Sequence, residues 1–186
     1  MMILIAGLVV FFAAHFFTAI ARGARDGLVR RMGEGPYKGA FALVSLAGFA
    51  LIILGWRSAD ASLVYTPPAF LRHATLALMP FATILIVAAF APAGRIASAA
   101  KHPMLVAVKI WAFAHLLSNG EVRSVLLFGA FLAFAVIDRI ALKKRKAPTP
   151  VPGPIRNDII AVVAGLAVYA AIYLWAHRWI AGVPLS

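Results

Sequence analysis

The stretch "ILIAGLVVFFAAHFFTAIA", residues 3 to 21, decides the fold of this chain. It contains no Lys, Arg, Asp or Glu. A helix needs about 20 predominantly apolar residues to cross a hydrocarbon core about 30 Å thick, so this stretch predicts a transmembrane helix. Its basic neighbours, Arg22 and Arg25, follow the apolar run rather than precede it, so we expect the segment to be retained rather than removed as a secretion signal.

Five further apolar segments predict the rest of the fold: residues 38 to 56, 74 to 91, 104 to 119, 123 to 141 and 158 to 178. The chain is 63% hydrophobic and only 13% charged, which is typical of a membrane protein. We therefore expect an all-α, polytopic bundle of about six transmembrane helices, forming one domain over residues 1 to 186. The segment 104 to 119 is the shortest and most polar, so its span requires neighbouring helices that shield Lys109 from lipid.

The positive charges predict the orientation of the bundle. Of the 18 Lys and Arg residues, thirteen fall in the first, third and fifth connections and four on the opposite side. The positive-inside rule then places the odd connections in the cytoplasm and both termini outside, in a multi-pass protein of the bacterial inner membrane. The run "KKRKAPTPVPGP", residues 143 to 154, is typical of a solvated linker. Because topology accounts for the net charge of +12, nucleic acid is not an expected partner, and the lipid bilayer is.

Several classes of chemistry are excluded or unsupported. The chain has no Cys, which excludes disulfides, thiolate metal ligands and cysteine nucleophiles. It also has no phosphate-binding glycine loop, serine nucleophile motif or HExxH motif. Hydrolase chemistry is therefore unsupported.

Two histidines lie deep in apolar segments: His15 in "VVFFAAHFFTAI" and His115 in "IWAFAHLLSNG", one helical turn after Trp111. A buried imidazole needs a hydrogen-bond acceptor, a metal or a water. Interhelical hydrogen bonding is one interpretation for each. The other is a pair that binds the iron of a haem from both faces, with Trp111 in the flat apolar pocket. Helical rise places His15 in the cytoplasmic half and His115 in the periplasmic half, so helix tilt has to bring their nitrogens to about 4 Å from each other.

Lys109 requires a counter-charge inside the bilayer. The acidic candidates are Asp138 and Asp158, near the inner ends of the fifth and sixth segments, and a haem propionate would serve equally well. Asp138 has its own alternative partners in Arg139 and Arg156.

The remaining histidines, His73, His102 and His177, lie near the predicted interfaces, where we expect them to act as anchors. His102 lies on the same side of the membrane as His15. It is therefore the fallback partner of His15 as a metal ligand.

Several stretches resemble the NnrU family of bacterial inner-membrane proteins, which is named for its association with denitrification genes and the nitric oxide response. They are "GEGPYKGAFALVSLAGFALI" (33 to 52), "TPPAFLRHATLALMPFATILIVAAF" (66 to 90), "KHPMLVAVKIWAFAHLLSNG" (101 to 120), "FGAFLAFAVIDRI" (128 to 140) and "GVPLS" (182 to 186). The HPM and AHLL signatures, thirteen residues apart from histidine to histidine, are fairly specific.

The same domain occurs in the plant 15-cis-zeta-carotene isomerases, which contain haem b. The resemblance to their first-helix histidine and their HP…AH helix implies that His15 and His115 bind the iron of a haem b here. Lys109 and Trp111 join them as expected cofactor-binding residues. This chain lacks the long extension of those enzymes and the histidine pair of their fifth helix, so carotenoid chemistry does not follow from the resemblance.

Three functions fit these observations. The first is a haem protein with a redox, nitric oxide related or isomerase-like role, acting on a small hydrophobic substrate where it has enzymatic activity. The second is a proton-linked carrier in which Lys109 and Asp138 exchange partners. The third is a non-catalytic helper that assembles respiratory membrane proteins.

Overall fold

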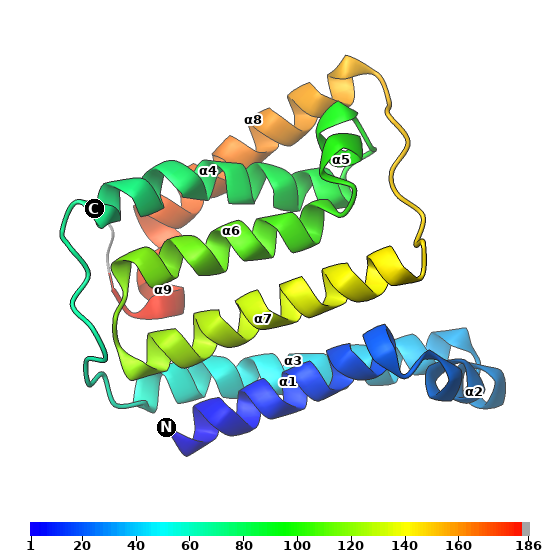
Figure 1. Ribbon diagram of the computed structural model, residues 1–186, viewed down its shortest axis with the longest axis horizontal. Helices are drawn as coiled ribbons and strands as arrows, with labels where there is room; N and C mark the ends of the chain where they lie inside the picture. The colour runs from blue at the N-terminus through cyan, green and yellow to red at the C-terminus, as the bar shows by residue number, and fades with distance from the viewer. Residues whose placement is uncertain (184–186) are drawn as a thin grey trace. The chain divides into compact units, whose positions relative to one another are not determined.

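The computed structural model describes residues 1 to 183, and most of the closing "GVPLS" motif lies outside this range. The described chain is helical and forms no strand; Leu63 and Glu121 make an isolated bridge. The helices are α1 (Met2–Ile20), α2 (Arg22–Met32), α3 (Glu34–Ser58), α4 (Leu71–Phe90), α5 (Arg95–Ala100), α6 (Pro103–Ser118), α7 (Val122–Lys144), α8 (Ile155–Ala171), the π-helical turn η1 (Ile172–Ala176) and α9 (His177–Ala181) (Figure 1). The predicted all-α fold class is confirmed.

Each of the six predicted segments is a helix. Five are long and apolar enough to cross a membrane: α1, α3, α4, α7 and the continuous helix formed by α8, η1 and α9. The sixth, α6, has 16 residues and is about 24 Å long, which is shorter than the hydrocarbon core. Large apolar side chains such as Leu43, Phe81 and Val163 remain 60% or more exposed, as expected of helices whose outer faces meet lipid.

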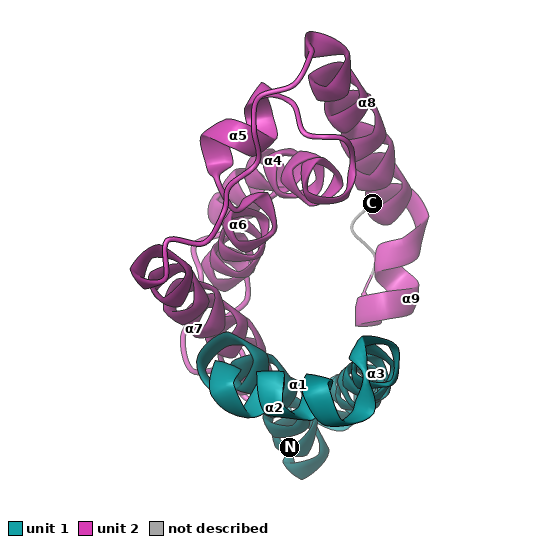
Figure 2. Cartoon of the chain, turned by 90° about the vertical axis from the view of Figure 1, so that its right-hand side faces the viewer, with its two compact units in different colours: residues 1–61 teal, residues 62–186 magenta. Residues whose placement is uncertain are grey.

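The chain forms two compact units, Met1–Ala61 and Ser62–Ser186 (Figure 2). In the first unit α1 packs antiparallel against α3, because Gly7 faces Ile52 and Gly48 faces Phe11. A Cβ on Gly7 would lie 2.6 Å from the Ile52 nitrogen, and one on Gly48 would lie 2.7 Å from the Phe11 nitrogen. Small residues of this kind allow membrane helices to approach backbone to backbone.

The second unit is built around α4, which packs against both α6 and α8, while α6 also packs against α7. Thr75 of α4 donates a hydrogen bond to the Ala114 carbonyl of α6 (2.7 Å). Gly165 of α8 approaches the backbone of Ile84 of α4. Polar side chains and close glycine contacts thus replace the hydrophobic effect, which does not drive helices together inside lipid.

At one end of the second unit, the connection between α4 and α6 meets the start of α8. Asp158 accepts hydrogen bonds from the backbone nitrogens of Arg95 (3.0 Å) and Ile96 (2.9 Å), and the Asn157 amide donates one to the Ala93 carbonyl (2.8 Å). Two of the three basic connections therefore lie at the same end, as the charge pattern requires of the cytoplasmic side.

At the opposite end, the connection that leads into α4 meets the connection between α6 and α7. The Val64 nitrogen donates to the Gly120 carbonyl (2.8 Å), and the Val122 nitrogen donates to the Ser62 carbonyl (2.9 Å). These are the connections with few basic residues, as expected for the outer side.

Two helices are not predicted by the sequence: α2 and the short α5. The first basic connection forms the helix α2, which begins at Arg22 and ends at Met32, directly before Gly33. Gly33 has φ of 88°, in the region that favours glycine, so the chain can turn there into α3. Gly23 and Gly27 lower the helix propensity of this segment, so the sequence alone indicates a loop there rather than a helix.

Candidate functional site

His15 lies in the second half of α1 and is held by its own helix. Its Nδ1 atom is 2.7 Å from the Phe11 carbonyl oxygen, one turn earlier. Its ring stacks on that of Phe11, with centroids 4.0 Å apart, and lies 5.2 Å from the ring of Phe41 on α3. The half-buried imidazole thus has a fixed orientation within the first unit.

His115 lies near the end of α6, in a matching arrangement. Its Nδ1 atom is 2.8 Å from the Trp111 carbonyl oxygen, again one turn earlier. Its ring stacks on Phe128 of α7, with centroids 4.5 Å apart. The Trp111 ring contacts Phe128 and Phe131 of α7 edge to face, at 5.0 and 5.3 Å.

The two arrangements fix the same tautomer. A backbone carbonyl can only accept a hydrogen bond, so Nδ1 of both His15 and His115 carries the proton. In the neutral imidazole the other nitrogen, Nε2, then has the lone pair that binds a metal. Metal-binding histidines commonly donate their second ring nitrogen to a carbonyl in this way, which orients the ring and increases its basicity. The donor chemistry of both side chains therefore fits the axial ligands of a haem iron.

The structure places these two histidines in different units, His15 in Met1–Ala61 and His115 in Ser62–Ser186. Each unit contains one of these imidazoles, with its Nδ1 atom held by a carbonyl of its own helix. Among the described residues, no group of three or more His, Cys, Asp or Glu side chains is arranged to hold a metal ion. A haem, by contrast, requires only one or two axial ligands from the protein.

Lys109 lies on α6 and is half-buried. No ion pair joins it to Asp138 or Asp158 in the described part of the chain. Asp158 is instead directed at the first backbone nitrogens of α5, where a carboxylate also complements the helix dipole. Asp138 has an oxygen, Oδ1, that is buried without a hydrogen-bond partner in the described range.

His102 is the residue directly before α6, and Pro103 occupies the first turn, as expected of a helix entry. Partial burial lowers the pKa of His102, and the nearby Arg139 lowers it further. Thirteen residues of helix separate His102 from His115, which corresponds to about 20 Å. His102 therefore stays a fallback partner for His15 only.

His177 lies at the start of α9, where the sequence predicts an interfacial anchor. In the structure its Nδ1 atom is 2.8 Å from the Val183 carbonyl, and the residue lies within electrostatic range of His115. The sequence position of His177 gives no signal of this proximity. The π-helical turn η1 lies directly before this residue.

Comparison with known proteins identifies the family. The family model described as NnrU protein matches residues 3 to 185, which is nearly the whole chain. The chain belongs to the NnrU family. Neither the comparison with curated proteins nor that with solved structures found a match.

Within this NnrU-family chain, the two sequence signatures lie at opposite ends of α6. The HPM signature forms the entry of the helix at His102, and the AHLL signature places His115 in its last turn. The helix that joins them contacts both α4 and α7.

Proposed function

We propose that this NnrU-family membrane protein holds a b-type haem through Nε2 of His15 and Nε2 of His115 and has a redox role. The observation that carries the proposal is the shared tautomer. Both imidazoles donate Nδ1–H to the carbonyl one turn earlier in their own helix, at 2.7 and 2.8 Å. This leaves the same nitrogen of each ring as the ligand atom.

The surroundings of each ring support the same proposal. Phe11 stacks on His15, and Phe128 stacks on His115, so both imidazoles are kept in fixed rotamers by aromatic rings. Trp111 adds a large apolar surface next to His115. A porphyrin is flat and apolar over most of its area, and it prefers such surroundings.

Lys109 supplies the charge that a haem propionate requires. It is half-buried on α6 and makes no ion pair with a residue of the described chain. A buried ammonium without a counter-charge is costly, and a propionate carboxylate satisfies it. We expect Lys109→Met to weaken haem retention and Lys109→Arg to preserve most of it.

A haem held by both His15 and His115 would supply one-electron redox chemistry. The nitric oxide related and isomerase-like roles that the resemblance implies would require one of these histidines to give up the iron to another ligand. Addition of nitric oxide to the reduced protein distinguishes these roles, since loss of an imidazole ligand shifts the Soret band.

A reduced-minus-oxidised visible spectrum of the full-length protein, purified after expression with adequate haem supply, tests the proposal. We expect a Soret band and α and β bands in the wild-type protein, and their loss or a marked shift in His15→Ala and His115→Ala. His73→Ala is the matched control, because His73 lies at the start of α4 and has no assigned ligand role. A featureless Soret region in the wild-type protein contradicts the proposal. If a stoichiometric protein partner then co-purifies, the assembly role is favoured.

A second function, proton-linked transport, is supported by Oδ1 of Asp138, which is buried without a hydrogen-bond partner in the described part of the chain. Acidic side chains within membrane helices are typical of ion and proton pathways. Uptake into vesicles that is driven by a proton gradient, and that is lost in Asp138→Asn and Lys109→Gln, would support this function. Uptake that does not depend on Lys109 would contradict this transport function.

A further inference from the structure

The first unit has a groove of about 500 Å³ where α1 ends and α2 begins. Its lining comes from one aromatic residue of α1 and one side of α2: Phe17, Ala24, Gly27, Leu28, Arg30 and Arg31. Apolar and cationic side chains thus border the same hollow. The groove lies within the first unit, and its chemistry does not depend on haem binding.

The sequence of α2 explains the shape of the groove. One face of α2 carries the residues at positions i, i+3, i+4 and i+7, which are Ala24, Gly27, Leu28 and Arg31. Ala24 and Gly27 have little or no side chain, which leaves the hollow open. A Cβ on Gly27 would meet only Arg30 Nη2, at 3.9 Å, so the Arg30 guanidinium lies beside the space that the glycine leaves.

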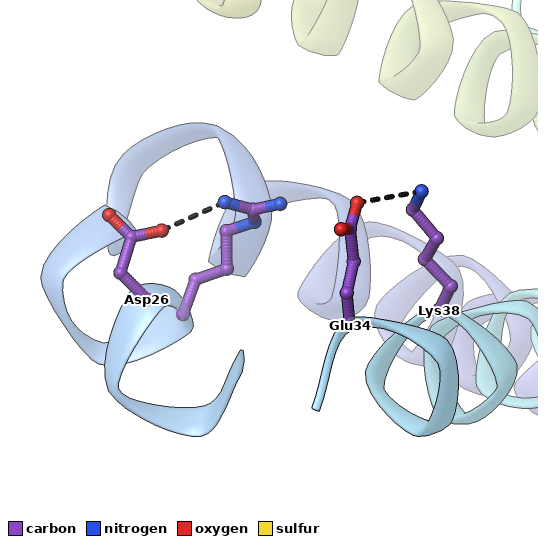
Figure 3. A network of polar contacts seen from close by, with 4 residues as sticks. Asp26, Glu34 and Lys38 are labelled. Atoms are coloured by element: carbon purple, nitrogen blue, oxygen red, sulfur yellow. Dashed lines mark hydrogen bonds and ion pairs between the residues drawn. The ribbon is translucent and has the colours of Figure 1, made fainter. Parts of the chain in front are cut away.

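The charges around the groove are unbalanced. Residues 22 to 38 contain five basic side chains and two acidic ones. Both acids are already paired: Asp26 with Arg25 and Glu34 with Lys38, each at 2.8 Å (Figure 3). Arg30 and Arg31 are exposed, and neither makes an ion pair with a residue in the described range. The groove therefore carries two guanidinium groups that attract an external anion.

The position of the groove limits what that anion can be. α1 is long and apolar enough to cross a membrane and ends at Ile20, so α2 starts at the membrane surface. Leu28 and Met32, one turn apart on α2, are 40% and 43% exposed, which is typical of a helix that rests on lipid. The charge pattern assigns this side to the cytoplasm, where the leaflet contains anionic lipids.

We propose that this groove is a binding site for one anionic phospholipid of the cytoplasmic leaflet. The lipid phosphate binds Arg30 and Arg31, which present planar donors to its oxygens. The start of an acyl chain lies against Phe17 and Leu28. A phospholipid satisfies both kinds of lining at once, whereas a free phosphate ion would leave the apolar part of the groove without a partner.

Native mass spectrometry of the full-length protein tests this, with micelles that contain equal amounts of phosphatidylglycerol and phosphatidylcholine. We expect the wild-type protein to retain one phosphatidylglycerol in preference to phosphatidylcholine. The double variant Arg30→Gln/Arg31→Gln should lower this preference roughly 30-fold, from the attraction that each arginine contributes at an anionic surface. Gly27→Leu fills the hollow without changing any charge, and it should also reduce retention.

The matched control is Lys143→Gln/Lys144→Gln, which removes two charges of the same sign from the end of α7. Far-UV circular dichroism confirms that each variant keeps its helices. The proposal is overturned if the Arg30→Gln/Arg31→Gln variant retains the lipid like the wild type, or if the control loses the preference equally. It is also overturned if excess inorganic phosphate displaces the lipid fully, because the groove would then be a site for the free ion.

Discussion

Gly48 of α3 packs against the backbone of Phe11 on α1. Phe11 in turn contacts the candidate ligand His15. In Gly48→Ala, the new Cβ would lie 2.7 Å from the Phe11 nitrogen and 2.9 Å from its Cα atom. Ordinary contact begins near 3.4 Å, so α1 and α3 have to separate by about 0.7 Å at this point. Overpacking of this kind costs about 1–3 kcal/mol, and the better helix propensity of Ala offsets up to about 1 kcal/mol. We expect a net loss of about 1–2 kcal/mol.

Gly39→Ala is the control for this prediction, because Gly39 lies on the same helix and a Cβ added to it would have no other atom within 4 Å. It should leave stability unchanged or raise it by up to about 1 kcal/mol. The assay is unfolding in mixed detergent micelles with increasing dodecyl sulfate, followed by far-UV circular dichroism. Equal stability of Gly48→Ala and Gly39→Ala would refute the close backbone packing of α1 on α3.

The same substitution has a consequence for the candidate site. Phe11 provides both the carbonyl that accepts the His15 Nδ1–H bond and the ring that stacks on His15. A displacement of the α1 backbone at Phe11 therefore changes the orientation of the imidazole. In protein that contains haem, Gly48→Ala should alter the Soret band, while Gly39→Ala should not.

Three further predictions concern the second unit. Thr75→Val removes the hydrogen bond to the Ala114 carbonyl and should destabilise the protein by about 0.5–1.5 kcal/mol in the same unfolding assay, whereas Thr75→Ser should retain most of the wild-type stability. Asp158→Ala leaves the first backbone nitrogens of α5 without an acceptor and should lower the free energy of unfolding by about 1–2 kcal/mol. Proteolysis in the connection between α4 and α6 should then become faster. An unchanged rate of proteolysis would contradict the assigned contact. The pKa of His102 is lowered from its ordinary value of 6.5, by partial burial first and then by Arg139, so its protonation is less favourable in the folded state. Its contribution to stability should be complete above about pH 6.5 and decline as the pH falls below that value, and His102→Gln should flatten this part of the stability profile.

The sequence is sufficient to predict the transmembrane helices, because a bilayer demands long and uniformly apolar runs. Their ends are less predictable. The structure begins α3 at Glu34 and ends α7 at Lys144, since charged residues continue a helix readily once it leaves the hydrocarbon. The helix α2 is hidden in the sequence, because its two glycines and four arginines look like a loop, although Ala24 and Leu28 already show a helical spacing.

The candidate site is predictable at the level of residue choice. His15 and His115 stand out because a polar ring in an apolar run requires a partner. Their tautomer is not predictable, since it depends on the rotamer that directs Nδ1 to the carbonyl one turn earlier. The sequence also does not determine whether Asp138 or Asp158 would be the counter-charge of Lys109. Asp158 contacts Arg95, 63 positions away in the chain, and only the folded connections bring these two together.

The central claim is the proposal that His15 and His115 bind the same haem iron. Electron paramagnetic resonance of the oxidised, full-length protein loaded with haem measures this most directly, because two axial imidazoles give a low-spin iron and a single one gives a high-spin iron. We expect a low-spin signal in the wild type that becomes high-spin in both His15→Ala and His115→Ala. A high-spin signal in the wild type, or a low-spin signal that survives either substitution, would contradict this claim.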